Sequence, residues 1–285
     1  MKLVSYGPKG EEKPGVVVGG EIVDLLCVEP VLPGTVRGIL AAGALDTVAG
    51  IARRIEALPQ AHRHALGSVR LGPPITDPSK IICLGLNYQD HAEEQNRPVP
   101  DSPLLFAKGP NTLAGDGDAM PYPRGVSQLD YEIELAFVIG RRAKHVAVED
   151  AMGYVAGYGV FMDLTARDIQ SRERQWLRAK SADGSGPFGP FLVTRDEVPD
   201  PHALGISLTV NGETLQSSNT GRMFFRVDFL ISFMSQTMTL EPGDIVATGT
   251  PSGVGVYRNP QRFLATGDTV VGRIDGLGTL TCVIA

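Results

Sequence analysis

The sequence predicts an α+β fold that is mainly β. After residue 72 the chain consists mostly of short apolar runs separated by Gly, Pro, Asn and Asp, which is typical of strands joined by turns. The segment 206–216 (ISLTVNGETLQ) places an Asn-Gly pair between two alternating runs, the strongest short-range signal for a β-hairpin. Helical patterns are few, and the clearest are 164–176 (LTARDIQSRERQW) and 225–238 (FRVDFLISFMSQTM).

Residues 1–72 are predicted to form a separate small α/β domain. They begin with three strand-like runs, KLVSY, GVVVG and EIVDL, and continue with Ala-rich helical segments such as IARRIEAL. The stretch 71–80 (LGPPITDPSK) is rich in Pro and therefore marks a boundary, and the run KIICLGL that follows predicts a buried strand. We therefore expect a small domain over 1–72 and a main domain over 73–285.

The predicted helix 225–238 has an apolar stripe. The residues at helical spacing are Phe225, Phe229, Leu230, Phe233 and Met234. We expect this stripe to face the core.

Composition excludes several classes of function. With 42% hydrophobic and 20% charged residues, the chain has the balance of a globular protein with a sizeable core. A net charge of -6 provides no basic surface for nucleic acid, and no apolar stretch reaches the ~20 residues of a membrane helix. We therefore expect neither a nucleic-acid nor a membrane partner.

The cysteines and the N-terminus predict a cytoplasmic protein. The opening MKLVSYGPKGEEK is broken by Gly, Pro and charges, so it is unlike a signal peptide. Cys27, Cys83 and Cys282 are far apart in the sequence, and each lies in an apolar stretch. This pattern predicts buried, reduced thiols.

Glu132 and Glu134 alternate with apolar residues in the run 129–140 (LDYEIELAFVIG). Side chains alternate faces along a strand, so both carboxylates point the same way. Three explanations are open: a solvated face of an edge strand, an acid and nucleophile pair of the glycosidase kind, or oxygen ligands of a hard divalent cation such as Mg²⁺. The metal explanation requires a further ligand.

Asp163 is the candidate for that ligand. It ends the apolar run YVAGYGVFM and begins the predicted helix 164–176, a strand-end position where an acid can face a site. Arg167 and Gln170 follow at i+4 and i+7, so we expect them on one helix face with Asp163. A plain helix N-cap is the alternative role for this aspartate.

His91 and Glu94 form a second candidate pair, in the segment 84–94 (LGLNYQDHAEE). They can meet on a helical turn, where the carboxylate fixes the imidazole tautomer and gives a general base that can activate water. The alternative is a surface pair without function. The adjoining RPVPDSP is loop-like, which predicts a mobile cover over a site.

Two further candidates lie in loops. The segment 249–256 (GTPSGVGV) lacks the Gly-Lys-Ser/Thr of a phosphate loop, and a glycine turn that presents backbone N–H groups and Thr250 to an anionic ligand explains it better. Lys180, in RAKSADG, is an isolated cation beside small residues. An ordinary solvated lysine is its alternative.

The order of these segments resembles the fumarylacetoacetate hydrolase family. The series GLNYQDHAEE, DYEIELAFVIG, DLTARDIQ, AKSADGSGPFGP, NGETLQ and LEPGDIVATGTPSGVG covers 73–285. Residues 1–72 are similar to the small N-terminal domain of the bacterial branch, and YPRGVSQLDYE resembles enzymes that act on 2,4-diketo-3-deoxy sugar acids. The resemblance implies a mixed β-roll of the family's C-terminal type as catalytic domain, a homodimer, and Mg²⁺ (or Mn²⁺ or Ca²⁺) as cofactor.

The resemblance also implies roles for individual residues. The family's metal ligands fall on Glu132, Glu134 and Asp163. Its catalytic residues fall on His91, Glu94 and Lys180. Its substrate contacts fall on Arg167, Gln170 and Thr250.

The activity implied by the resemblance is hydrolysis of a C–C bond in a 2,4-diketo acid, either an acylpyruvate or a diketo-deoxy sugar acid. The products are pyruvate and a carboxylic acid. His91, held by Glu94, would take a proton from the attacking water. The alternatives are decarboxylation of oxaloacetate-like acids or isomerisation of unsaturated 2-oxo diacids through an enolate, and, from another class, a binding protein without turnover. The expected partner is a small-molecule oxo acid.

Overall fold

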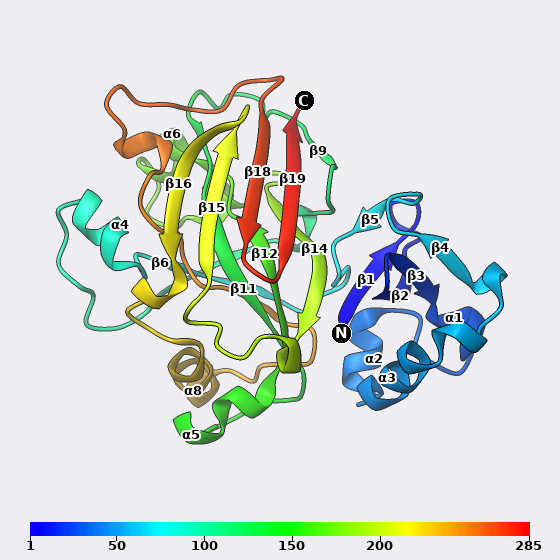
Figure 1. The fold of residues 1–285 in the computed structure, drawn as a ribbon. Helices are drawn as coiled ribbons and strands as arrows, with labels where there is room; N and C mark the ends of the chain where they lie inside the picture. Colours follow the sequence, from blue (N-terminus) through cyan, green and yellow to red (C-terminus); the bar gives the residue numbers. More distant parts are fainter.

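The computed structural model describes residues 1–285 and contains two large β-sheets and a short two-stranded ribbon (Figure 1). The larger sheet has 12 strands and the smaller sheet has five. The smaller sheet packs across the middle of the larger one, and side chains of both sheets share one buried core. The predicted α+β, mainly β fold, a mixed β-roll, is confirmed.

The larger sheet carries the candidate site in its middle. Ten of its strands follow the order β4-β3-β2-β1-β14-β12-β11-β17-β6-β7, and the other two, β5 and β8 (Leu113–Ala114), pair with β1 and β14. β17 and β6 run parallel while the neighbouring pairs are antiparallel, so the sheet is mixed. The strands around the site are β11 (Ile133–Ile139), β12 (Val155–Met162), β14 (Gly186–Thr194), β17 (Ile245–Ala247), β6 (Ile81–Gly85) and β7 (Leu104–Lys108). β6 is the buried strand predicted at KIICLGL.

The smaller sheet contains the predicted hairpin. Its order is β16-β15-β18-β19-β9. Asn211 and Gly212 connect the hairpin strands with φ of 51° and 84°, the left-handed values that a two-residue turn requires, and the prediction is confirmed. The strands are β15 (Gly205–Val210), β16 (Glu213–Asn219), β18 (Thr269–Ile274), β19 (Gly278–Ile284) and β9 (Ala119–Met120).

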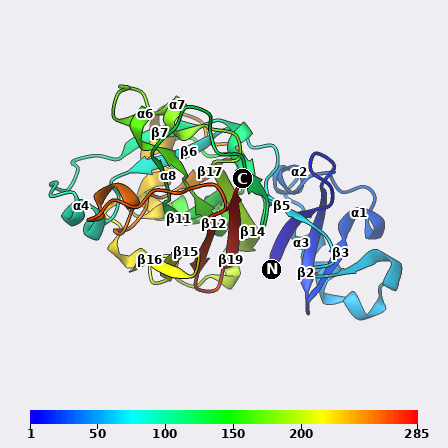
Figure 2. The same ribbon diagram turned by 90° about the horizontal axis from the view of Figure 1, so that it is seen from above.

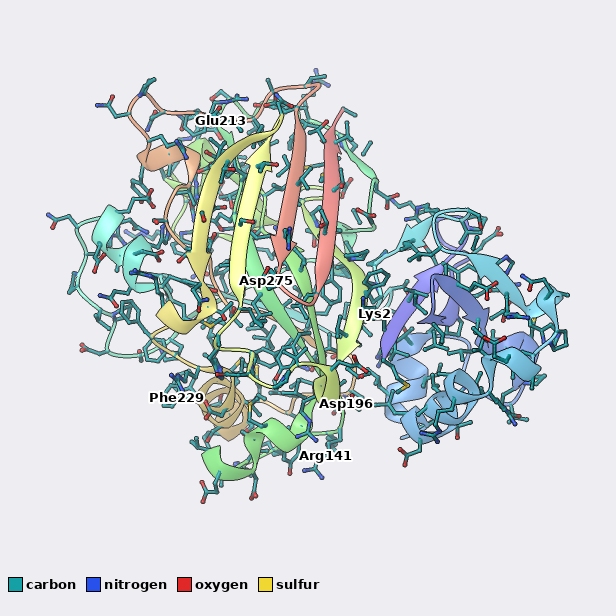
Figure 3. All side chains as sticks on the ribbon, in the orientation of Figure 1. Lys2, Arg141, Asp196, Glu213, Phe229 and Asp275 are labelled. Carbon is teal, nitrogen blue, oxygen red and sulfur yellow. The ribbon has the colours of Figure 1, made fainter.

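The first part of the chain forms a lobe at one end of the molecule (Figure 2). The three predicted strands are present, and β1 pairs with β14, with Leu3 opposite Leu192. At the same junction the Lys2 ammonium lies 5.1 Å from the ring centre of Phe191 (Figure 3). The lobe contains β1 (Lys2–Tyr6), β2 (Lys13–Val18), β3 (Glu21–Asp24), β4 (Arg63–Ala65), β5 (Leu71–Gly72), α1 (Leu25–Val28), α2 (Val36–Ala41) and α3 (Leu45–Arg53). The sheet is therefore continuous across residue 72, and the domain division there stays a prediction.

The predicted helix 164–176 is wrong. Thr165 and Ala166 form the short strand β13, which pairs with β10 (Leu129–Asp130), and only one helical turn follows, α6 (Arg167–Gln170). Asp163 is therefore not an N-cap, because its backbone N–H donates to Glu132 O at 2.9 Å and Ala166 precedes the helix. A long-range strand pair has overridden the local helical pattern. The next helix is α7 (Leu177–Lys180).

Helix α8 (Val227–Thr237) is present as predicted, but its apolar stripe covers two different faces. Leu230 and Met234 are buried, whereas Phe229 and Phe233 are 39% and 37% exposed. At 100° per residue the two phenylalanines lie well away from the buried face. The rings of Phe225, Phe229 and Phe233 instead stack on one another along the outside, with centres 5.5 and 6.0 Å apart (Phe229 is labelled in Figure 3). The short helix α5 (Val148–Ala151) packs against α8.

The cysteine prediction holds for two of the three thiols. Cys83 and Cys282 are buried, and burial raises the pKa of both. Cys27 is exposed, because the Asp24 side chain accepts hydrogen bonds from the N–H groups of Leu26 and Cys27 and begins helix α1, which turns Leu25 inward and Cys27 outward. None of the helices has the length and apolar character of a membrane span.

Candidate metal centre and active site

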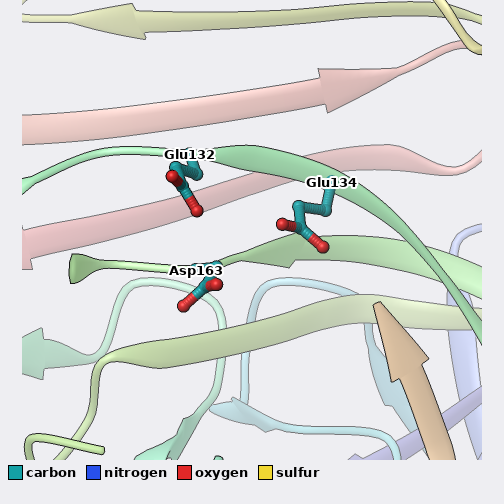
Figure 4. Close-up of side chains that lie close together, drawn as sticks. All are labelled: Glu132, Glu134 and Asp163. Atoms are coloured by element: carbon teal, nitrogen blue, oxygen red, sulfur yellow. The ribbon is translucent and has the colours of Figure 1, made fainter. Parts of the chain in front are cut away.

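Three buried carboxylates meet where β11 and β12 pair. Glu132 directly precedes β11, Glu134 is the second residue of that strand, and Asp163 follows the last residue of the antiparallel strand β12 (Figure 4). One oxygen from each carboxylate lies within 4.8 Å of the other two. The exposed fractions are 5%, 1% and 0%, which excludes the solvated edge strand among the explanations for the paired glutamates.

Basic side chains hold two of the three carboxylates. The Lys180 ammonium donates to Glu132 Oε2 at 2.8 Å and to Asp163 Oδ2 at 2.7 Å. Lys108, which sequence reasoning missed, donates to Asp163 Oδ1 at 2.7 Å. Lys180 is itself buried, so the explanation as a solvated lysine is wrong. Glu134 accepts only the backbone N–H of Gly249, at 2.8 Å, and has no cationic partner.

Because of this asymmetry, the pKa values of Glu132 and Glu134 shift in opposite directions. Burial alone would raise the pKa of Glu132, but the charges of Lys180 and Arg167 outweigh it and hold that pKa well below its usual range. Burial, followed by the charges of Asp163 and Glu132, raises the pKa of Glu134 well above its usual range. For Lys180, burial would lower the pKa, but the two carboxylates keep it raised. Glu134 is therefore the carboxylate of the cluster that resists ionisation when no cation lies beside it.

The residues fit a divalent metal. All the ligand atoms are carboxylate oxygens, which is the donor set that hard cations such as Mg²⁺ and Mn²⁺ prefer. A cation beside Glu134 would also offset the charge that Gly249 alone leaves uncompensated. Glu132, Glu134 and Asp163 are the residues that would hold it.

Arg167 connects this cluster to the loop that follows β17. Its guanidinium donates to Asp130 Oδ2 at 2.8 Å, to Glu132 Oε1 at 2.5 Å and to Gln170 Oε1 at 2.9 Å. Asp130, also missed from the sequence, accepts the backbone N–H of Gly255 at 2.7 Å. The predicted contact between Arg167 and Gln170 is present, although no helix face links them to Asp163. The signal for Asp130 was its place in the same DYEIE run as the two glutamates.

The predicted His91–Glu94 pair is present on the short helix α4 (Gln89–Glu94). His91 Nδ1 lies 2.9 Å from Glu94 Oε2, and the N–H of Gly253 donates to Glu94 Oε1 at 2.9 Å. Only 6% of His91 is exposed, so this is not a surface pair. With Nδ1 bonded to the carboxylate, Nε2 is the ring nitrogen left for a reactant.

The glycine turn at 249–256 donates a backbone hydrogen bond to a carboxylate of the protein itself, that of Glu134. Gly249 has φ of 89°, and its N–H donates to Glu134 as described above. Thr250 Oγ1 donates to Ile133 O at 2.8 Å and accepts from Gln216 Nε2 at 2.9 Å. The turn therefore fixes the strand that carries the glutamates, and Thr250 also lines the cavity next to them.

A cavity of about 690 Å³ connects these groups. Its lining includes Glu132, Glu134 and Lys180 together with His91 of α4. The cavity is also lined by the lid segment, which we define as residues 86–103 between β6 and β7. A second cavity of about 760 Å³ lies on the other side of Glu94 and contains none of the three clustered carboxylates.

The β-roll thus brings buried carboxylates that could hold a divalent metal, a buried lysine and a histidine paired with a glutamate to one cavity, which is the arrangement of an enzyme active site. The model for the fumarylacetoacetate (FAA) hydrolase C-terminal domain matches residues 80–285. The chain belongs to the fumarylacetoacetate hydrolase family of enzymes, which confirms the resemblance seen in the sequence.

The proteins to which this chain is similar carry the names of several different activities. It is 44% identical to the mitochondrial oxaloacetate tautomerase Fahd2a of Rattus norvegicus, over 98% of this chain and 90% of that protein. The fumarylacetoacetate hydrolase of Exiguobacterium antarcticum has a TM-score of 0.87 and 35% identity, covering 100% of this chain and 99% of that one. The maleylpyruvate hydrolase of Sphingobium sp. SYK-6, solved with manganese(II) and pyruvate, has a TM-score of 0.82 and 29% identity, with the same coverage.

Proposed function

We propose that this protein catalyses the enol–keto tautomerisation of an oxaloacetate-type 2-oxo acid with a divalent metal. The observation that carries the proposal is that one cavity is lined both by Glu132 and Glu134 of the carboxylate cluster and by His91, which is paired with Glu94. The identity to oxaloacetate tautomerases over nearly the whole chain supports the choice of reaction. Mg²⁺ is our proposed metal, and Mn²⁺ is equally compatible with the oxygen ligands.

The protein's own residues supply the proton transfers. His91, oriented through Nδ1 by Glu94, takes a proton from C3 of the keto form at Nε2. The electron pair of that C–H bond forms the C2–C3 double bond, and the C2 oxygen is protonated to give the enol, with the Lys180 ammonium as the nearby donor. The reverse sequence returns the keto form. A divalent cation held by the carboxylate cluster would act as a Lewis acid and stabilise the negative charge that develops.

Hydrolysis of a 2,4-diketo acid is the second candidate. The same histidine would take a proton from water, and the hydroxide would attack the 4-keto carbon. The C3–C4 bond then breaks with its electrons moving toward C3, C3 takes up the proton held by His91, and pyruvate and a carboxylic acid are released. The match to maleylpyruvate hydrolase favours this alternative. The His91–Glu94 pair does not separate the two reactions, because a base is needed in both.

One experiment separates the two candidates. The Mg²⁺-loaded protein is given oxaloacetate, with loss of the enol absorbance as the readout, and acylpyruvates or maleylpyruvate, with pyruvate release as the readout. We expect tautomerisation above the buffer rate that is lost with EDTA, and a reduction of about 10²–10⁴-fold in His91→Gln. Asp275→Asn, an exposed site that does not line the cavity (labelled in Figure 3), is the matched control and should keep the wild-type rate. Pyruvate release without tautomerisation would favour hydrolysis. The absence of both activities would contradict both candidates.

A further inference from the structure

One cation in the active-site cavity has no carboxylate partner. The basic side chains of the lining, apart from His91, are Lys180, Arg167 and Arg97. Lys180 is bound to Glu132 and Asp163, and Arg167 is bound to Asp130 and Glu132. The guanidinium of Arg97 makes no ion pair and no side-chain hydrogen bond with the protein. It is the one cation of the lining, apart from His91, that no carboxylate of the protein neutralises.

The way α4 ends fixes the position of Arg97. Asn96 has a left-handed φ of 51°, its N–H donates to Glu93 O at 3.0 Å, and the N–H of Arg97 donates to Ala92 O at 2.9 Å. This pair of bonds is a Schellman cap, which stops the helix and sets the direction of the next residue. His91 lies on the same short helix. The base and the unpaired cation are therefore parts of one unit.

The surroundings of Arg97 leave its charge exposed to a ligand. The lining also includes the apolar side chains of Val99, Leu104 and Trp176, and the guanidinium of Arg97 lies over no aromatic ring. Asp101 is the carboxylate of the lid segment that lines the cavity, and it forms no ion pair with Arg97. Its negative charge would oppose binding of an anion, whereas that of Arg97 would favour it.

From these contacts we infer that Arg97 binds the second carboxylate of a short dicarboxylic 2-oxo acid, whose 2-oxo end lies at the carboxylate cluster. The inference rests on the proposed function of this cavity and deepens it by naming the residue that selects the substrate. Arg97 is a specificity residue in this reading, because a substrate without the second carboxylate would leave the guanidinium in water. A charge-assisted hydrogen bond in a partly closed cavity discriminates by about tenfold.

The test compares oxaloacetate with its 4-methyl ester, which keeps the 2-oxo acid end and lacks the second charge. Wild type, Arg97→Gln, Arg97→Lys and Asp101→Asn are assayed for tautomerisation with saturating Mg²⁺. We expect Arg97→Gln to lower kcat/KM about tenfold for oxaloacetate and to leave the ester unchanged. Arg97→Lys should retain most of the preference, and Asp101→Asn should keep or increase it.

Two results would overturn the inference: an equal loss on both compounds, which indicates a structural role for Arg97, or no change on either. If the wild type turns over neither compound, the proposed function is contradicted, and calorimetric affinities of the Mg²⁺-loaded protein for the two compounds then decide the role of Arg97. A preference for the diacid that disappears in Arg97→Gln supports it. An unchanged preference, or no binding of either compound, contradicts it.

Discussion

Glu134 is the carboxylate of the cluster that has only a backbone N–H as partner. Its pKa is raised in the folded state, so the folded metal-free protein binds this proton more tightly than the unfolded chain does. Stability of the metal-free protein is therefore expected to fall as the pH rises from the ordinary glutamate pKa through the raised one. A metal ion at the cluster would remove this dependence, because it favours the charged form.

Glu134→Gln should separate stability from metal binding. Removing the buried charge is expected to raise Tm in EDTA by at least about 2 °C, the shift that about 1 kcal/mol produces in a chain of this size. Mg²⁺ at a hundred times its Kd is expected to stabilise the wild type by about 2.7 kcal/mol. The rise in Tm that results should disappear in the variant. Thermal melts with EDTA and with Mg²⁺ are the measurement, with Asp275→Asn as control. A variant that is still stabilised by Mg²⁺ would show that Glu134 is not a ligand.

Lys108→Met should destabilise the protein most when metal is absent. Lys108 and Asp163 are both buried, and removing one partner of a buried pair costs about 3–5 kcal/mol. A bound cation would replace part of the lost charge, so the loss in the free energy of unfolding should be smaller with Mg²⁺ than with EDTA. Denaturant titrations under both conditions measure this, and the exposed Lys144→Met is the control. Equal losses under both conditions would show that a metal ion does not replace the charge of Lys108.

At the scale of elements, Glu94 connects α4 to the loop after β17 through its two oxygens. Glu94→Ala should release both contacts, so amides in 89–94 and 252–256 should exchange faster with solvent, and tautomerisation should fall about 10²-fold or more. Glu94→Gln can keep its contact with Gly253 and should lose activity with less change in exchange. Unchanged exchange in Glu94→Ala would mean that other contacts hold the helix.

Elements with local causes were predictable, and those with long-range causes were not. The β15–β16 hairpin follows from Asn211-Gly212 alone. The prediction of a helix over 164–176 was wrong because Thr165 pairs with Asp130 in a strand, which replaces the helix that the composition of the segment favours. Lys108 and Asp130 were missed for a similar reason, since only the sheet brings Lys108 next to a residue 55 positions away. The resemblance, rather than residue spacing, selected the metal explanation for the glutamates.

At the scale of the whole molecule, the first 72 residues share a core with the rest. One buried cluster contains Leu3 and Leu25 together with Phe161, Phe188 and Leu192. A fragment beginning at residue 73 would expose those apolar side chains and the edge of β14. We expect this fragment to aggregate or to melt at least about 10 °C below the full chain, because losing several kcal/mol of burial shifts Tm by that amount. Size-exclusion chromatography and thermal melts are the checks, and a soluble fragment of unchanged Tm would support independent domains. The homodimer and the cytoplasmic location stay predictions.

The lid segment has an evolutionary consequence. Gly85 and Leu104, the residues on either side of it, lie directly opposite one another in the β6–β7 pair. The sheet therefore closes the ends of this insertion, whatever its length or composition. Relatives can exchange or lengthen the segment, and with it the base-bearing helix and Arg97, while the carboxylates on β11 and after β12 stay in place. One scaffold can thus acquire new substrates by replacing a single continuous stretch of gene sequence.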